Sequence, residues 1–307
     1  MATYQPKNIS LDGDALISVA MSSFDPSRIT LLFLHGLGDS SLAWKELFEA
    51  GRFDRYNLIA PDLAGFGGTA SQAGQTFGFA DQLRLVGKLL DKVQPDKLVI
   101  IGHSMSGVMG GWLTAALLQA TGKQECDPLF GWTGLTSADL LPQDSLRAIE
   151  LCGFVSVEGT LVVKDASISR RAIDAWDRGM FDRWFKAFLK SSTGPQWLKE
   201  NPGITHYQQS VRSALPEAFH ACAADLDAWK QLIDNSDVSH SAHLLLQLQL
   251  PVAYLYGSES VHPKALELLS GSSIEAIGFA GAGHWLMNQQ NEKFQVVLED
   301  LLERWVK

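Results

Sequence analysis

Short apolar runs alternate with amphipathic stretches through the first half of the chain. Continuous apolar runs of this kind are typical of strands that are covered on both faces. Four of them predict strands, at residues 15–20, 30–35, 56–60 and 97–101. Two stretches predict helices, residues 41–50 and 79–93, and the second keeps its apolar side chains at helical spacing. Strands that alternate with helices predict a parallel sheet wrapped by helices.

The second half returns to this alternation after a long interruption. Residues 153–157 predict a further strand, but residues 160–246 contain no strand candidate beyond 161–163 and otherwise look helical and aromatic. The alternation then resumes with strands at 251–256 and 273–279, a short helix at 263–269 and a closing amphipathic helix. We therefore predict one α/β domain, residues 1–159 and 247–307, interrupted after the strand at 153–157 by a helical segment, residues 160–246.

The connection at residues 124–151 is longer than an ordinary link between a helix and a strand. Gly, Pro, Thr and Asp residues occur throughout it, and its sequence has no clear helical or strand pattern. We predict that this connection forms a lid or an interface element.

Composition excludes several classes of protein. Of the 307 residues, 46% are hydrophobic and 19% are charged, which excludes disorder for most of the chain. The formal net charge of −9, without a clear cluster of Lys and Arg, argues against nucleic acid and anionic membranes as partners. No apolar run approaches the roughly 18 residues of a membrane span and the start has no signal-peptide core, so we expect a cytoplasmic protein. The three cysteines are too widely spaced for a disulfide framework or a zinc site, and they predict packing residues: Cys126, Cys152 and Cys222.

The strongest chemical signal is Gly102-His103-Ser104-Met105-Ser106-Gly107, between the strand at 97–101 and a helix predicted to begin at Val108. This segment resembles the nucleophile elbow of the α/β-hydrolase family, in which a serine occupies a sharp turn from strand to helix. The residues two before and two after that serine must be small, and Ser106 replaces the usual glycine. The resemblance implies an α/β-hydrolase fold, a mostly parallel central sheet flanked by helices. It also implies that residues 160–246 form a helical cap and that Ser104 is the nucleophile.

A second match follows the strand at residues 30–35, where His35 leads into Gly36-Leu37-Gly38-Asp39. The resemblance implies an oxyanion hole made by the backbone N–H groups of Leu37 and Met105. His35 is then expected to stabilise this loop.

The glycine-rich segment at residues 61–67 has two interpretations. It resembles a loop that the family carries after its next strand, and residues 65–70 also satisfy the fingerprint of a dinucleotide site. That fingerprint must open a helix at once and find an acidic residue about twenty positions later at a strand end. Residues 71–75 continue as loop and Asp91 lies inside a predicted helix, so we expect a structural turn and no bound nucleotide.

His284 is the expected general base. It lies in Gly281-Ala282-Gly283-His284-Trp285, between the last predicted strand and the last predicted helix, which is where the resemblance places the base. The neighbouring glycines leave room for its imidazole to reach Ser104.

The acid that orients His284 has two candidates. The family's usual position, after the penultimate strand, is occupied by Ser260, which cannot carry negative charge. Glu259 lies one residue earlier, and the alternation of side chains at a strand end would point it away from His284. Glu158 directly follows the strand before the helical segment, where some family members, including certain haloalkane dehalogenases, draw their acid. We favour Glu158 and keep Glu259 as the alternative.

A serine nucleophile implies acyl transfer, whereas relatives with an Asp nucleophile form alkyl esters. We therefore predict hydrolysis of a carboxylic ester or lactone through an acyl-Ser104 intermediate, with no cofactor and no metal. The net charge makes a neutral or apolar small-molecule substrate the expected partner. Two alternatives stay open: hydrolysis of a carbon–carbon bond in a ring-cleavage product, and a non-catalytic ligand receptor on the same fold. The missing acid at position 260 is the reason for the second alternative.

Overall fold

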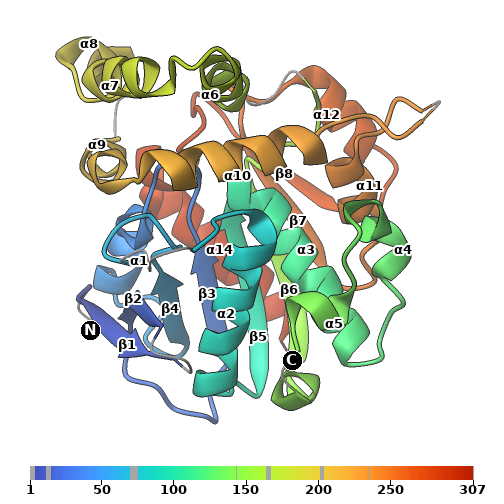
Figure 1. Ribbon diagram of the computed structural model, residues 1–307. Coiled ribbons are helices and arrows are strands. Elements are labelled where there is room, and N and C mark those ends of the chain that lie inside the picture. The colour runs from blue at the N-terminus through green and yellow to red at the C-terminus, as the bar shows by residue number, and fades with distance from the viewer. Residues whose placement is uncertain are drawn as a thin grey trace.

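The computed structural model of the chain describes residues 4–11, 15–69, 75–142, 144–163, 167–200, 204–234 and 236–306. Its centre is an eight-stranded sheet with the order β1-β2-β4-β3-β5-β6-β7-β8 (Figure 1). The β1–β2 and β2–β4 pairs are antiparallel, and all other neighbours are parallel. The strands are β1 (Pro6–Ser10), β2 (Leu16–Met21), β3 (Thr30–Leu34), β4 (Asn57–Pro61), β5 (Lys97–His103), β6 (Glu150–Val157), β7 (Val252–Gly257) and β8 (Glu275–Phe279).

Helices connect the strands and close the chain. The α-helices are α1 (Lys45–Glu49), α2 (Phe79–Val93), α3 (Met105–Ala120), α4 (Asp127–Phe130), α5 (Ser137–Leu140), α6 (Ser167–Asp177), α7 (Phe181–Ser192), α8 (Pro195–Glu200), α9 (Thr205–Ser210), α10 (Pro216–Trp229), α11 (His240–Gln247), α12 (Pro263–Leu269), α13 (Leu286–Gln289) and α14 (Asn291–Trp305). The 3-10 helices are η1 (Ser41–Trp44), η2 (Gly131–Thr133), η3 (Asp144–Ala148) and η4 (Val211–Ser213).

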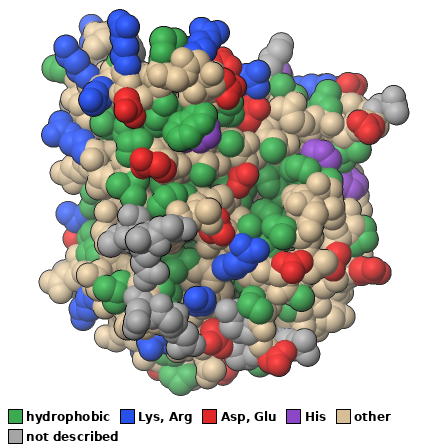
Figure 2. Space-filling model, in the orientation of Figure 1, with side chains coloured by type: hydrophobic (Ala, Val, Ile, Leu, Met, Phe, Trp, Pro, Cys, Tyr) green, Lys and Arg blue, Asp and Glu red, His purple; other side chains and the backbone are tan. Residues whose placement is uncertain are grey.

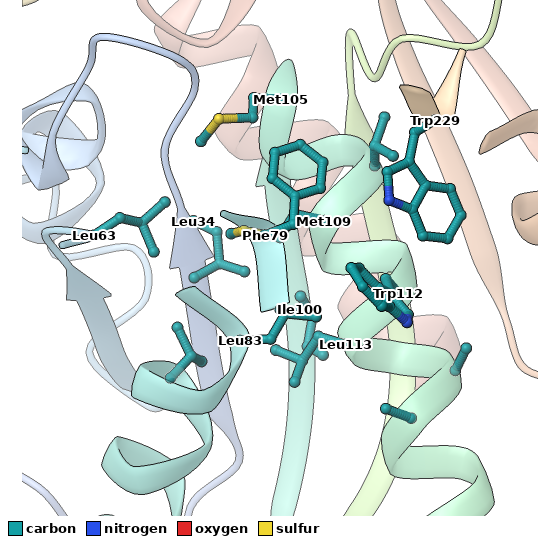
Figure 3. Packing of buried hydrophobic residues seen from close by; sticks show 14 of the residues in the cluster. Leu34, Leu63, Phe79, Leu83, Ile100, Met105, Met109, Trp112, Leu113 and Trp229 are labelled. Atoms are coloured by element: carbon teal, nitrogen blue, oxygen red, sulfur yellow. The ribbon is translucent and has the colours of Figure 1, made fainter. Parts of the chain in front are cut away.

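The central strands are apolar on both faces because helices cover both faces. Successive side chains of a strand point to opposite sides of the sheet. Leu34 and Ile100 pack against α2 and α3, where Figure 3 shows them beside Leu83 and Leu113. The neighbouring residues on the same strands, Phe33, Val99 and Ile101, point to the other face and belong to a second buried cluster, which contains side chains of α1 and α14. The predicted class, a mostly parallel sheet flanked by helices, is confirmed.

Several local predictions differ from the structure. The strand β1 has no apolar run, because most of its side chains are exposed at the edge of the sheet. The strand candidate at 161–163 is wrong: these residues lie in a loop that bends at Val162. The carbonyl of Leu161 accepts a hydrogen bond from the Ser239 hydroxyl at 2.5 Å instead of pairing with a strand. The helix predicted from Val108 begins at Met105, because a single residue makes the turn from β5.

The connection at residues 124–151 does not cover the predicted site. Its short helices α4, α5 and η3 contact α2, α3 and α11. None of its described residues lines the cavity next to Ser104, so the structure gives no support to a lid, and an interface element stays a prediction.

Helices α6 to α11 occupy the chain between β6 and β7, as predicted for the helical segment. Figure 1 shows α6 to α10 together above one end of the sheet. The assignment of residues 160–246 to a separate cap domain stays a prediction. No helix in the described part of the chain is both long and apolar enough to cross a membrane.

Protonated His206 is expected to stabilise the contact between α9 and η1–α1. Its Nε2 bonds to the carboxylate of Glu46, and this hydrogen bond raises the pKa of His206. A raised pKa means that the contribution to stability is full below the unfolded pKa of about 6.5 and is lost as pH rises through the folded pKa. In urea unfolding, His206→Gln should cost about 0.5–1 kcal/mol more at pH 6 than at pH 9, because the pair is partly exposed. Equal costs at both pH values, or the same pH dependence in a Glu46→Gln background, would contradict this role.

Candidate active site

Ser104 lies at the tip of a sharp turn between β5 and α3. Its backbone has φ 53° and ψ −113°, and its N–H donates to the carbonyl of Val157 at 2.8 Å. A Cβ atom on Gly102 would lie 1.9 Å from the carbonyl oxygen of Ser106, and one on Gly107 would lie 2.4 Å from the Cα of Gly159. The chain can make this turn only because both positions are glycine.

Ser106, the departure from the family pattern, has a defined hydrogen bond. It is fully buried, and its hydroxyl donates to the carbonyl of His35 at 2.5 Å. Position 106 therefore connects the start of α3 to the loop that follows β3. The backbone N–H of Leu63 donates to His35 Nε2 at 3.0 Å, so Nδ1 carries the proton and donates to the carbonyl of Gly36 at 2.9 Å. Burial lowers the pKa of His35, which keeps the ring neutral in this network.

Three side chains that lie far apart in the sequence meet above the sheet. Ser104 Oγ is 2.9 Å from His284 Nε2, and His284 Nδ1 is 3.2 Å from Glu158 Oε2. With the proton on Nδ1 donated to Glu158, Nε2 is free to accept the proton of the Ser104 hydroxyl. This order of contacts is the one that activates a hydroxyl nucleophile.

The carboxylate of Glu158 is held by groups from β7 and the loop that follows it. Its Oε1 accepts hydrogen bonds from the N–H of Gly257 at 2.6 Å and the hydroxyl of Ser260 at 2.9 Å. The alternative candidate, Glu259, is exposed, and its carboxylate bonds to Ser258 rather than to His284. Ser260, which occupies the family's usual acid position, thus donates a hydrogen bond to an acid carried by the neighbouring strand.

Backbone strain is concentrated at this site. Among the described residues, the non-glycine residues with positive φ are Ser104, Glu158 and Gln94. The left-handed region costs a non-glycine residue roughly 1–3 kcal/mol and is retained where the surrounding structure demands it. At Gln94 the positive φ terminates helix α2, whereas at Ser104 and Glu158 it directs two side chains toward one imidazole.

His103 packs against His284 and bonds to its backbone. Its Nε2 donates to the backbone carbonyl of His284 at 3.0 Å, and the two ring centroids are 4.9 Å apart. Burial, together with the nearby His284, lowers the pKa of His103 well below its usual value. Its Nδ1 has no hydrogen-bond partner in the part of the chain that the structure describes. His103 therefore stays neutral and adds no charge beneath His284.

The two predicted oxyanion donors come from the start of α3 and from the loop after β3. Met105 is the first residue of α3, and the first N–H groups of a helix have no acceptor within it. Leu37 borders the same cavity as Ser104. The positions of both residues are consistent with donors that face the reacting carbonyl oxygen.

A cavity of about 430 Å³ opens beside Ser104, a volume suited to a small organic molecule. Apolar and hydroxyl-bearing side chains line it, without any Lys or Arg, and Glu158 brings the only carboxylate among the lining residues. The helical segment, β7 and its loop, and the loop before α13 contribute lining residues that local patterns do not identify: Thr160, Ile168, Ser169, Tyr207, Leu226, Tyr254, Val261, His262, Pro263 and Trp285.

The loop that satisfies the dinucleotide fingerprint is tightly packed. A Cβ on Gly67 would lie 2.3 Å from the carboxyl carbon of Asp62, and the carbonyl of Gly65 accepts the N–H of Leu215 at 2.8 Å. The same Asp62 carboxylate accepts the N–H of Ser41 at 2.7 Å. These contacts are those of a structural turn. Among the described residues, no group of three or more His, Cys, Asp or Glu side chains could hold a metal ion.

Comparison with known proteins agrees with this architecture. Residues 31–294 match the model of the family described as "Alpha/beta hydrolase family". The chain belongs to the α/β-hydrolase family. It is 32% identical over 93 residues to "Uncharacterized hydrolase YugF" of Bacillus subtilis, a match that covers 30% of this chain and 33% of that protein. The match thus spans only about a third of that relative's length.

Solved structures of family members share the fold across nearly the whole chain. A thermophilic esterase from Thermogutta terrifontis, solved with malate bound, superposes with a TM-score of 0.64 at 19% identity and covers 99% of this chain and 100% of its own. The N-acyl homoserine lactonase AidH, in complex with N-butanoyl homoserine, gives a TM-score of 0.67 at 14% identity, with coverage of 99% and 98%. At these identities the likeness shows the fold alone. The family predicted from the segment around Ser104 is confirmed.

Proposed function

We propose that this protein is a serine hydrolase that cleaves a carboxylic ester or lactone through an acyl-Ser104 intermediate. The observation that carries the proposal is the continuous hydrogen-bonded chain from Ser104 through His284 to Glu158. Membership of a hydrolase family, with esterases and lactonases among the proteins of similar fold, supports the reaction class.

In the first half of the reaction, Ser104 Oγ attacks the carbonyl carbon of the substrate while His284 Nε2 takes the hydroxyl proton. The carbonyl oxygen gains the negative charge, and the N–H groups of Leu37 and Met105 stabilise it. When the tetrahedral intermediate collapses, the leaving oxygen takes the proton from His284 Nε2. The acyl group remains bonded to Ser104 Oγ.

In the second half, water attacks the acyl carbon and gives its proton to His284 Nε2. The new tetrahedral intermediate releases Ser104 Oγ, which recovers that proton, and the carboxylic acid leaves. In both halves His284 becomes positively charged for a moment, and the carboxylate of Glu158 at 3.2 Å stabilises that charge. The residues of the chain supply every proton transfer in this scheme.

The cavity favours a neutral substrate of moderate size. Its lining has no Lys or Arg side chain that would attract an anion, and Glu158 would repel one. Ile168, Tyr207 and Leu226 come from the segment at 160–246, so we propose that this segment is a cap that shapes the substrate pocket. The ester or lactone is therefore expected to carry an uncharged acyl group.

The position of Glu158 weakens the argument for a non-catalytic ligand receptor. That interpretation rested on the serine at position 260 in place of an acid. Because Glu158 brings a carboxylate to His284 from the neighbouring strand, the missing acid no longer favours a non-catalytic protein.

Substrate competition between three chemical classes tests the proposal. Purified protein should hydrolyse a short aryl ester or an uncharged lactone, and a fluorophosphonate should label Ser104 covalently, as mass spectrometry of the peptide would show. Turnover of a vinylogous diketone in preference to both would instead assign the carbon–carbon bond reaction. No turnover together with no labelling would overturn the hydrolase proposal.

Ser106 is expected to position the donor loop. Ser106→Ala would leave the buried carbonyl of His35 without its donor and loosen the loop that carries Leu37. We expect kcat for an aryl ester to fall about tenfold, below the 10²–10³-fold loss of a deleted oxyanion donor, with KM nearly unchanged. For a thionoester, whose sulfur is a weaker hydrogen-bond acceptor, kcat should fall less. The ratio of the ester rate to the thionoester rate should therefore be lower in the variant than in the wild type.

Thr114→Ala is the matched control for this prediction. Thr114 is another buried hydroxyl of α3, and it donates to the carbonyl of Gly110 at 2.8 Å, within its own helix. The control should lose stability without a change in the ester-to-thionoester ratio. The same ratio in Ser106→Ala as in the wild type would show that Ser106 is only structural.

A further inference from the structure

Helices α6 and α7 form a hairpin with a groove between their facing sides. The groove has a volume of about 490 Å³, and the lining residues differ from those of the cavity at Ser104. Positions 171, 174, 175 and 178 line one side and positions 180, 183, 184 and 187 line the other. Each set has the spacing i, i+3, i+4 and i+7 of one helix face. Arg178 lies just after the end of α6, and Met180 just before the start of α7. Either face is about 10 Å long at 1.5 Å per residue.

Three arginines border this groove, and none of them has a partner in the described part of the chain. Arg171, Arg178 and Arg183 make no ion pair or hydrogen bond with any residue that the structure describes. The one acid in the lining, Asp174, pairs instead with Arg170 at 3.5 Å. A guanidinium group presents several N–H donors in a planar fork that matches a carboxylate. The groove therefore offers unused donors for an anion.

The rest of the groove is apolar. Ala175 is buried, Trp184 is half-buried, and Met180 and Ala187 are exposed, Met180 with 45% of its surface. Exposed apolar surface beside unpaired guanidinium groups is typical of a site that binds a ligand with both characters. A simple anion would leave this apolar surface uncovered.

The charge of the hairpin is opposite to that of the chain. Residues 167–192 hold Arg170, Arg171, Arg178, Arg183, Lys186 and Lys190 against Asp174, Asp177 and Asp182, in a chain with a net charge of −9. Figure 2 shows Lys and Arg side chains gathered at the top of the molecule, where Figure 1 places α6 and α7. The sequence pattern shows no basic cluster here, because the arginines come from two helices and acids separate them along the chain.

We infer that the α6–α7 groove binds an amphiphilic carboxylate, with the carboxylate on the arginines and the aliphatic chain along Ala175, Met180 and Trp184. This inference does not rest on the proposed function, because none of the residues that carry it lines the cavity at Ser104. A concave groove about two helical turns long fits a single aliphatic chain rather than a flat membrane surface.

Calorimetric titration of the full chain with sodium octanoate at low ionic strength tests this site. We expect saturable binding, at least tenfold tighter than that of acetate or of the neutral octanamide. The triple variant Arg171→Gln, Arg178→Gln, Arg183→Gln should weaken octanoate binding at least tenfold. A matched triple variant that removes three charges outside the groove, Lys186→Gln, Lys190→Gln, Lys199→Gln, should change it less than twofold.

The triple arginine variant also separates the two sites, because octanoate bound beside Ser104 would survive these substitutions. A second measurement uses the wild-type groove: 2-bromooctanoate should quench tryptophan fluorescence, and Trp184→Phe should remove most of that quenching. Octanoate binding that is absent, or equally strong in the arginine variant, would overturn the inference. Binding only to phosphatidylglycerol vesicles would assign the surface to a membrane instead, and acetate as tight as octanoate would reduce it to a simple anion site.

Discussion

Ser104→Ala is expected to lower kcat for a short aryl ester by about 10⁴–10⁶-fold, and His284→Ala should lower it by a similar factor. The two side chains act on one proton, since Ser104 Oγ lies 2.9 Å from His284 Nε2. Without the hydroxyl the imidazole has no nucleophile to activate, and without the imidazole the hydroxyl keeps its proton at neutral pH. The double variant should therefore be no slower than the slower single variant. Steady-state kinetics of the two single variants and the double variant, with active-site titration of the wild type, would measure these losses.

His262→Gln is the control for the histidine substitution. His262 lines the same cavity, and its Nδ1 accepts the N–H of Lys264 at the start of α12, but it makes no hydrogen bond to Ser104. This variant should keep kcat within about tenfold of the wild type while KM changes, as expected for a residue that only contacts substrate. If the losses of Ser104→Ala and His284→Ala multiplied in the double variant, the two residues would act independently and the proposed proton transfer would be wrong.

The positions of Ser104 and His284 could be predicted because each depends on a local pattern. A buried strand, a turn of small residues and a helix are adjacent in the sequence around Ser104, and the loop of His284 lies between the last strand and the last helix. The sheet could be predicted for a related reason: its central strands are apolar on both faces, so they stand out as continuous runs. The edge strand β1 has no such run, because solvent rather than a helix faces most of its side chains.

The rest of the site depends on contacts between distant segments. Sequence patterns place both Glu158 and Glu259 at strand ends, and only the three-dimensional register of β6 beside β7 brings one carboxylate to His284. The cavity lining contributed by α6, α9 and α10 follows from how these helices pack above the sheet, which the spacing of apolar residues within each helix does not determine. For the same reason, the arginines of the α6–α7 groove form a cluster in space and none in the sequence.

Glu158→Gln is expected to lower kcat by about 10³–10⁴-fold while Glu259→Gln leaves it nearly unchanged. The Gln amide can still accept the hydrogen bonds from Gly257 and Ser260 through its oxygen, so its NH₂ group would face His284 Nδ1. Two donors would then oppose each other, which favours the tautomer with the proton on Nε2 and removes the base from Ser104. The reverse pattern of losses would assign the acid to Glu259.

Adding Ser260→Asp to Glu158→Gln should restore at least tenfold of the lost kcat. The Ser260 hydroxyl lies 2.9 Å from Glu158 Oε1, so a carboxylate at position 260 would enter the space that the acid of Glu158 occupies and return negative charge beside His284. In the wild-type background Ser260→Asp should instead lower activity, because two carboxylates would share one site and repel each other, which would disturb the contact with His284. General destabilisation would not make Ser260→Asp raise kcat in one background and lower it in the other. Thermal unfolding of the four proteins would show whether their stabilities differ. Loss of activity in both backgrounds would mean that a carboxylate can orient His284 only from position 158.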